Sequence, residues 1–238
     1  VFKYLGGVAL LELPFFAIGH VIAKNTQYPA DGFSAPYQYA LAYGVILYFI
    51  FAIFLLRNML LRYFNDFSVA CVLLLLILAT NLIQYVGIDS GQSHGYIFPL
   101  YALLLYFTLQ WHIRPSLKWT AGIGLIMGLA TICRPTEAIM IFIPILWNTH
   151  TKTSGEKKWA LVRKNSHHLA WVILFGLIGV LPQLIYWKSV TGSFFHDVGS
   201  KWVFFNPYFR VLFGWETGWF IYTPVALFFV LGLFFMKK

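Results

Sequence analysis

The apolar positions of the chain fall into long runs separated by short polar stretches, and this pattern predicts membrane-spanning helices. A helix needs about 20 apolar residues to cross a bilayer. None of the runs alternates apolar and polar residues as a barrel strand would. The candidate segments are residues 4–23, 37–57, 68–86, 96–112, 119–133, 136–148, 169–187 and 217–236. The pattern therefore predicts an all-α, polytopic transmembrane helical bundle that occupies residues 1–238 as a single domain.

Two of these segments, 119–133 and 136–148, are short and are separated by Arg134 and a proline. At ~1.5 Å per residue they would be about 22 and 20 Å long, less than the ~30 Å hydrocarbon core of a bilayer. Non-helical backbone at that depth must line a protein cavity or water. The break therefore predicts an outward-facing cavity lined by short helices. Gly124 and Gly128 form a pair of small residues at helical spacing, which predicts close packing against another helix.

The first segment allows two interpretations. Glu12 and Pro14 interrupt its apolar run, and a carboxylate at the centre of a spanning helix costs about 2.5–3.5 kcal/mol. Residues 4–23 therefore either span the membrane or form an interfacial or re-entrant helix. The chain also starts without Met and ends with Lys237 and Lys238 directly after an apolar run. We expect a fragment that lacks a first helix, a first external loop and a C-terminal part of a longer protein.

The composition excludes an ordinary soluble domain. Hydrophobic residues make up 60% of the chain and charged residues 11%, whereas a soluble domain has about 25% charged residues. The surplus apolar surface must face lipid, so the lipid bilayer is an expected partner. The composition equally excludes a disordered chain, a disulfide scaffold and a coiled coil.

The net charge of +9 comes from 17 Lys and Arg residues against 8 Asp and Glu residues. No basic stripe is interleaved with stacking aromatics on a polar element, so nucleic acid is not an expected partner. If loops 58–67, 113–118 and 149–168, the helix end at Arg57 and the C-terminal tail face the cytoplasm, eleven of the 17 basic residues lie inside and five outside. This asymmetry predicts the orientation, and most carboxylates then fall on the outer side.

The cysteine and histidine spacing predicts neither a metal motif nor a disulfide. The sequence contains no CxxC and no HExxH. Cys71 and Cys133 are expected near opposite membrane faces, too far apart to pair with each other.

Arg134 is the most informative polar residue of the predicted outer end. In one interpretation Pro135 starts the next helix, and Glu137 in its first turn forms an ion pair with Arg134. In the other interpretation Arg134 and the helix N-terminus form an anion site, because a guanidinium and free N–H groups can together bind a phosphate.

A second polar stretch precedes the helix predicted at 96–112. In one interpretation Ser93 or Asp89 caps or turns this helix. In the other, His94 faces the same cavity as Arg134 and donates a hydrogen bond to an anion or a sugar.

The predicted outer loop 188–216 is long and rich in aromatic residues. It forms either an interfacial aromatic belt or a lid over the outer cavity, because aromatic faces also suit sugar rings. The candidate residues of this loop and of the helix after it are His196, Asp197, Lys201, Trp215 and Tyr222. Asp31 is most simply a turn residue. Asn81 and Gln84 either point toward the same outer end or bond neighbouring helices.

Several strings, taken in order, resemble the GT-C superfamily of membrane glycosyltransferases. The "GLa-x-L-x-RP" helix pair of that superfamily is similar to GLATICRPTEAIMIFIPILW, and the helix before it is similar to SHGYIFPLYALLLYF. The bacterial branch near the protein O-mannosyltransferases and aminoarabinose transferases, glycosyltransferase family 39-like, has regions that resemble PFFAIGH, YPADGFSAPYQ, WKSVTGSFF, FFNPYF and GWFIYTPVALFFVLGL. The resemblance runs in order along nearly the whole chain.

The resemblance implies a multi-pass enzyme of the bacterial inner membrane that takes a sugar from a polyprenyl-phosphate lipid. It implies transfer, with inversion, to a hydroxyl of a glycan, lipid or protein acceptor on the extracytoplasmic side. Arg134 and His94 are then the expected donor-phosphate ligands. The catalytic carboxylate of such enzymes lies in the first external loop, and this chain begins after it, so Asp31 and Asp89 are only fallback candidates. No cofactor is assigned, and the participation of a divalent metal ion is left as an alternative.

Two other functions are compatible with the sequence. A transporter would show matching broken helices in two halves of the chain, whereas only one Arg-Pro break is evident. A non-catalytic membrane subunit of a larger complex would also show this composition.

Overall fold

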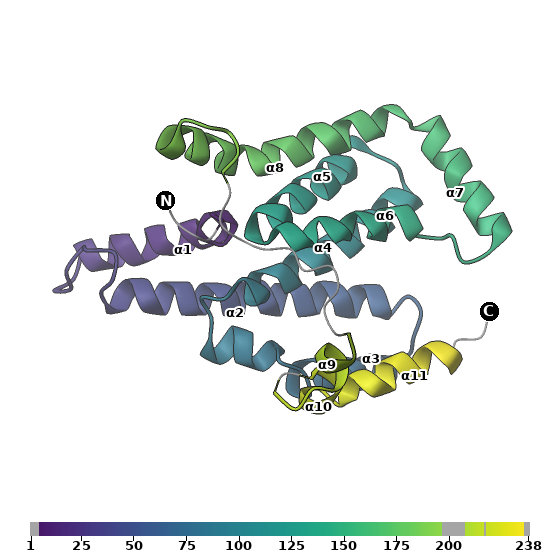
Figure 1. The fold of residues 1–238 in the computed structure, drawn as a ribbon, viewed down its shortest axis with the longest axis horizontal. Coiled ribbons are helices and arrows are strands. Elements are labelled where there is room, and N and C mark those ends of the chain that lie inside the picture. The colour runs from purple at the N-terminus through teal and green to yellow at the C-terminus, as the bar shows by residue number, and fades with distance from the viewer. Residues whose placement is uncertain (1–4, 197–207, 217, 236–238) are drawn as a thin grey trace.

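The computed structural model describes residues 5–196, 208–216 and 218–235. Every regular element in these ranges is a helix, so the prediction of an all-α helical bundle is confirmed (Figure 1). Four of the described helices are long and apolar enough to cross a membrane. They are α1 (Gly7–Lys24), α2 (Ala35–Leu60), α4 (Ser93–Ile113) and α8 (His167–Thr191).

The other described elements are shorter. They are α3 (Asp66–Leu78), the π-helical η1 (Gln84–Ile88), α5 (Leu117–Cys133), the 3₁₀-helical η2 (Pro135–Ile141), α6 (Phe142–Leu146), α7 (Lys152–Lys164), α9 (Tyr208–Phe213), α10 (Trp219–Tyr222) and α11 (Val225–Phe235). The predicted break after Cys133 is confirmed, because α5 ends there and Arg134 has extended backbone angles. The segment after the break is not one α-helix, since it starts as η2 and continues as the short α6.

The prediction of one continuous helix over residues 68–86 is wrong. Helix α3 ends at Leu78, and η1 begins only at Gln84. The Thr80 hydroxyl donates to the Leu76 carbonyl at 2.6 Å and accepts from the Leu82 backbone N–H at 3.3 Å. Such bonds between a side chain and nearby backbone compete with helical hydrogen bonding, and here they accompany the break.

The predicted helix over residues 217–236 is also broken, between α10 and α11. Pro224 lacks a backbone N–H and disfavours helical angles in the residue before it, and Thr223 has a φ of −133° and a ψ of 66°. The two breaks contact each other, because the Thr223 hydroxyl donates to Asn81 Oδ1 at 3.3 Å. Asn81 therefore bonds a neighbouring helix segment.

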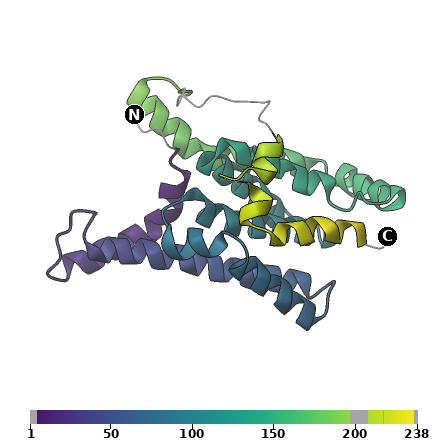
Figure 2. The same cartoon turned by 60° about the horizontal axis from the view of Figure 1, so that its bottom comes forward.

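Helices α1 and α2 form an antiparallel hairpin. A Cβ atom at Gly19 would lie 2.9 Å from the Tyr37 Cα atom, so the glycine permits close approach. Nearer the start of α1, the Tyr48 hydroxyl donates to the Leu11 carbonyl at 3.0 Å. The hairpin extends past the other helices at one end of the molecule (Figures 1 and 2).

Helix α5 lies between α4 and α8 at the centre of the bundle (Figure 1). The buried core around it consists of Ile97, Leu100, Leu104, Trp111, Ile123, Ile126, Ala130, Cys133 and Met140. A Cβ atom at Gly124 would overlap the Val172 carbonyl, and one at Gly128 would overlap the Gly176 carbonyl. The predicted close packing at this glycine pair is therefore confirmed, with α8 as the partner.

The outward surfaces of the long helices are apolar. Phe54 on α2 is 61% exposed, Leu177 on α8 is 59% exposed and Phe234 on α11 is 81% exposed. Contiguous apolar surface of this kind is rare on a soluble monomer. The helices therefore suit a lipid bilayer.

The interval 149–168, expected as a loop, contains helix α7. Thr151 and Ser154 form a capping box, in which the side chain of each accepts from the backbone N–H of the other at 3.1 Å. Helix α7 runs across the end of the bundle, between the end of α6 and the start of α8 (Figures 1 and 2). Its basic residues therefore gather at this end.

Candidate functional site

The structure brings Arg134 and His94 together from separate helices. Arg134 lies between α5 and η2, and His94 is in the first turn of α4. Arg134 Nη1 lies 3.2 Å from each ring nitrogen of His94. Since a guanidinium only donates, it binds whichever imidazole nitrogen carries no proton. The two residues named as candidate phosphate ligands are therefore in contact with each other.

Arg134 also forms the ion pair expected in the simpler interpretation. Its Nε lies 3.9 Å from Glu137 Oε1, and the Tyr101 hydroxyl donates to Glu137 Oε2 at 2.8 Å. The Glu137 side chain is 12% exposed and that of Arg134 is 38% exposed. The carboxylate is thus held inside the junction, while the guanidinium stays partly open to an additional ligand.

Tyr85 completes the surroundings of His94. The two rings stack with centroids 4.4 Å apart and an interplanar angle of 25°. Tyr85 lies on η1, whose π-helical turn follows the break after α3. The sequence does not predict a role for Tyr85, because an aromatic residue within an apolar run carries no signal of its own.

Glu12 contacts the same region through Tyr96. The Tyr96 hydroxyl donates to Glu12 Oε1 at 2.9 Å, and this bond joins α1 to the first turn of α4. A Cβ atom at Gly95 would lie 2.9 Å from Val45, ten residues into α2. At ~1.5 Å per residue, this places the start of α4 about 15 Å from the first residue of α2 along the helix. The junction therefore lies below the end of the α1–α2 hairpin.

The fallback carboxylates contact local groups. Asp31 Oδ1 accepts from the backbone N–H groups of Phe33 at 2.8 Å and Ser34 at 2.9 Å, which lowers the pKa of the Asp31 carboxyl. This is the turn role expected for Asp31. Asp89 Oδ2 accepts from the Gln84 side chain at 2.8 Å. Neither carboxylate has a described contact with Arg134 or His94.

Ser93 does not cap α4. It is the first helical residue, and Gln92 occupies the capping position without a side-chain hydrogen bond to the helix. Capping of this helix by Ser93 or Asp89 is therefore wrong, whereas the turn expected at Asp89 is present. The Asp89 side chain is taken up by Gln84, and the Asp89 carbonyl accepts from the Gln92 backbone N–H at 3.1 Å.

The candidates of the predicted aromatic loop do not join Arg134 in the described structure. Trp215 is 83% exposed, and its carbonyl accepts from the Tyr222 hydroxyl at 2.7 Å. His196 is half-buried at the end of the described range. Asp197 and Lys201 lie outside the described residues. The exposure of Trp215 agrees with an interfacial aromatic belt.

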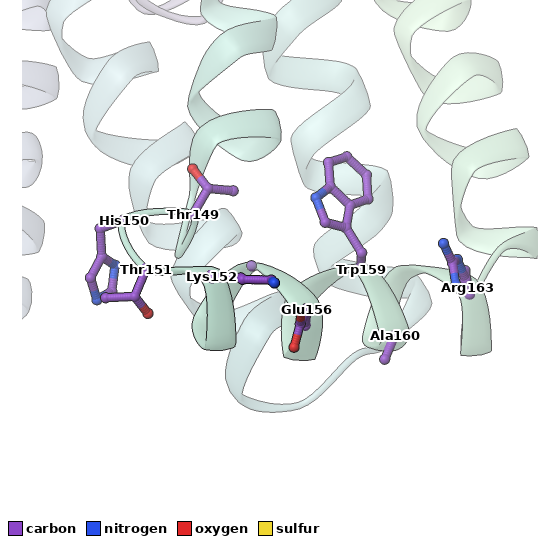
Figure 3. Close-up of a pocket in the computed structure, with 9 residues that line it drawn as sticks. Thr149, His150, Thr151, Lys152, Glu156, Trp159, Ala160 and Arg163 are labelled. Atoms are coloured by element: carbon purple, nitrogen blue, oxygen red, sulfur yellow. The ribbon is translucent and has the colours of Figure 1, made fainter.

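The structure has two pockets among the described helices. One of about 560 Å³ is lined by α7 and the turn before it, including Lys152, Trp159 and Arg163 (Figure 3). The other, about 700 Å³, runs between α5 and α8. Neither is lined by Arg134 or His94. The short helices on both sides of the break line the larger pocket, as predicted, but Arg134 and His94 do not. The described junction itself is a half-exposed polar cluster between helix ends.

The described residues contain no group of three His, Cys, Asp or Glu side chains that could hold a metal ion. Cys71 and Cys133 are both free thiols.

Comparison with protein families, with curated proteins and with solved structures finds no match to this chain. The site must therefore be interpreted from its own chemistry.

Proposed function

We propose that this protein is a membrane glycosyltransferase that moves a sugar from a polyprenyl-phosphate lipid to an acceptor hydroxyl on the extracytoplasmic side. The observation that supports the proposal is the contact of Arg134 with His94 at a break between helices in a lipid-suited bundle. The sequence resemblance to the GT-C superfamily assigns both residues to the donor phosphate.

The chemistry requires a group that stabilises negative charge on the donor phosphate. The acceptor oxygen attacks the anomeric carbon, the bond from that carbon to the phosphate oxygen breaks, and the phosphate leaves with the bonding electrons. A guanidinium that donates to the phosphate stabilises this charge as it develops. Arg134 is suited to the task, because its side chain is 38% exposed and the described contacts engage only Nη1 and Nε.

His94 has two roles in this proposal. It orients the guanidinium by accepting from Arg134 Nη1, and stacking on Tyr85 fixes the plane of the imidazole. Glu137 and Tyr101 hold the guanidinium from the other side. The proton of the acceptor hydroxyl passes to a general base that the proposal does not assign.

The test is sugar transfer by the full-length protein in proteoliposomes that contain radiolabelled polyprenyl-phosphate mannose and membrane acceptors. We expect Arg134→Gln to slow loss of label from the lipid donor by about 100-fold, as removal of one charge-stabilising donor does in other enzymes. The matched control is Arg57→Gln, because Arg57 pairs with Asp66 at 2.6 Å on an exposed surface. Transfer by Arg134→Gln at the parent rate would remove Arg134 from the mechanism.

A further inference from the structure

An apolar groove of about 700 Å³ runs between α5 and α8, and one of its ends lies beside α7. Its lining runs along α5 from Thr120 to Thr131 and along α8 from His168 to Val180. The eleven steps from Thr120 to Thr131 correspond to about 16 Å at ~1.5 Å per residue. The groove is therefore long enough for much of an acyl chain.

Lys158 of α7 lines one end of this groove and is only 4% exposed. Its ammonium donates to the Ile145 backbone carbonyl. No carboxylate forms an ion pair with Lys158 among the residues that the structure describes. Burial lowers the pKa of this ammonium. The described partners of this cation, a backbone carbonyl and the Trp159 ring, carry no counter-charge, and a buried cation without one is unfavourable unless an anion joins it.

Two histidines line the same end of the groove. His168 is 6% exposed, and its Nδ1 accepts from the Trp111 indole at 2.9 Å, so the proton of the neutral ring is on Nε2. His112 has the opposite arrangement, since its Nδ1 bonds the Thr108 carbonyl at 2.8 Å and its buried Nε2 has no partner among the described residues. The groove end therefore offers donors to an anion and an acceptor to a hydroxyl.

The position of α7 indicates where the anion comes from. The helix crosses the end of the bundle, between the end of α6 and the start of α8 (Figure 1). Trp159 points from α7 toward the helices of the bundle (Figure 3), and the Lys158 ammonium lies 4.8 Å from its ring centroid. Tryptophan and lysine side chains on such a helix are typical of the lipid headgroup region. Basic pockets between helices at this level suit phosphate headgroups.

We propose that Lys158 and the groove form a binding site for one anionic phospholipid from the leaflet next to α7. One acyl chain lies between α5 and α8, the headgroup phosphate accepts from Lys158 and His168 Nε2, and a headgroup hydroxyl donates to His112 Nε2. The proposal rests on residues outside the Arg134 junction and does not depend on the glycosyltransferase proposal.

The first test is native mass spectrometry of the delipidated full-length protein titrated with phosphatidylglycerol or with phosphatidylcholine of the same acyl chains. We expect preferential binding of phosphatidylglycerol, and a loss of about tenfold in its affinity in Lys158→Met, since hydrogen bonds to charged groups have this magnitude. Lys157→Met is the matched control, because it removes the same charge from the exposed face of α7. Binding by Lys158→Met equal to the parent, or an equal loss in Lys157→Met, would overturn the proposal.

A second variant tests the groove and leaves Lys158 intact. Ala138 lines the groove from η2 and has no described contact with Lys158, so Ala138→Trp should obstruct the acyl chain and weaken phosphatidylglycerol binding. Glycerol phosphate, which carries the headgroup without chains, should neither bind detectably nor displace the lipid. Full lipid binding by Ala138→Trp, or displacement by glycerol phosphate, would show that the groove does not hold the chain and would overturn the site as proposed.

Discussion

The two ends of α5 each lie near a cation and a histidine, and the surroundings differ. Near the end of α5, Arg134 is 38% exposed and 3.9 Å from the carboxylate of Glu137. Beside its first turns, Lys158 is 4% exposed and donates to a backbone carbonyl. The chain itself accounts for much of the Arg134 environment, whereas the described residues provide no counter-charge for Lys158. The comparison indicates that a cation favours an additional anionic ligand most when its side chain is buried and no carboxylate pairs with it.

The largest expected effect on stability concerns the packing of α5 against α8, which holds both ends of α5 in place. Gly128→Ala should lower the free energy of unfolding by about 2–3 kcal/mol, because its methyl group would overlap the Gly176 carbonyl of α8. Gly155→Ala on α7 is the control, since nothing lies within 4 Å of its Cβ position. It should be neutral or stabilise by up to about 1 kcal/mol. Thermal unfolding in detergent measures both, and equal stability of the two variants would contradict the α5–α8 packing.

The second prediction concerns Lys158 in the absence of lipid. Lys158→Met should raise the free energy of unfolding in lipid-free detergent by about 1–2 kcal/mol, because it removes an unpaired buried charge. Lys157→Met, on the exposed face, should change it little. Chemical denaturation checks this difference. A marked loss of stability in Lys158→Met would mean that the bond to Ile145 outweighs the cost of burial.

The third prediction concerns the surroundings of Arg134, the cation at the other end of α5. Tyr101→Phe should lower stability by about 1 kcal/mol, because it removes a hydrogen bond to the half-buried Glu137 carboxylate. Tyr106→Phe on the same helix is the control, since the Tyr106 ring packs against Phe107 and Trp119. The same denaturation assay compares them. Unchanged stability in Tyr101→Phe would show that Glu137 needs no support from α4.

The smallest effect is expected at Asp31, in the turn between α1 and α2. Two backbone N–H groups lower the pKa of its carboxyl below the usual 3.8, so Asp31 stabilises the folded state at neutral pH. This contribution is lost as the pH falls below 3.8 through the folded-state pKa. Asp31→Ala should therefore unfold at a slightly lower temperature than the parent at pH 7, with the difference narrowing toward pH 3. A pH-independent difference would exclude this linkage.

Hydrophobic patterning predicts the helical class and the break at Arg134, because both follow from residues close together in sequence. It misses the breaks at Thr80 and Thr223, since the local hydrogen bonds of Thr80 and the Asn81–Thr223 contact leave the apolar pattern intact. Helix α7 is missed because a short capped basic helix resembles a polar loop in composition.

The sequence predicts part of the candidate site. Arg134, His94 and Glu137 stand out as polar residues at helix ends, and the structure joins them. The roles of Tyr85, Tyr101 and Glu12 depend on helix packing that brings distant residues together, so spacing does not reveal them. The same holds for Lys158, whose burial against α6 distinguishes it from its exposed neighbour Lys157.

The most direct measurement is native mass spectrometry of the parent, Arg134→Gln and Lys158→Met with polyprenyl phosphate and, separately, with phosphatidylglycerol. The account predicts that Arg134→Gln weakens polyprenyl phosphate binding about tenfold and leaves phosphatidylglycerol binding unchanged, with the reverse for Lys158→Met. Unimpaired polyprenyl phosphate binding by Arg134→Gln would contradict the proposed donor site.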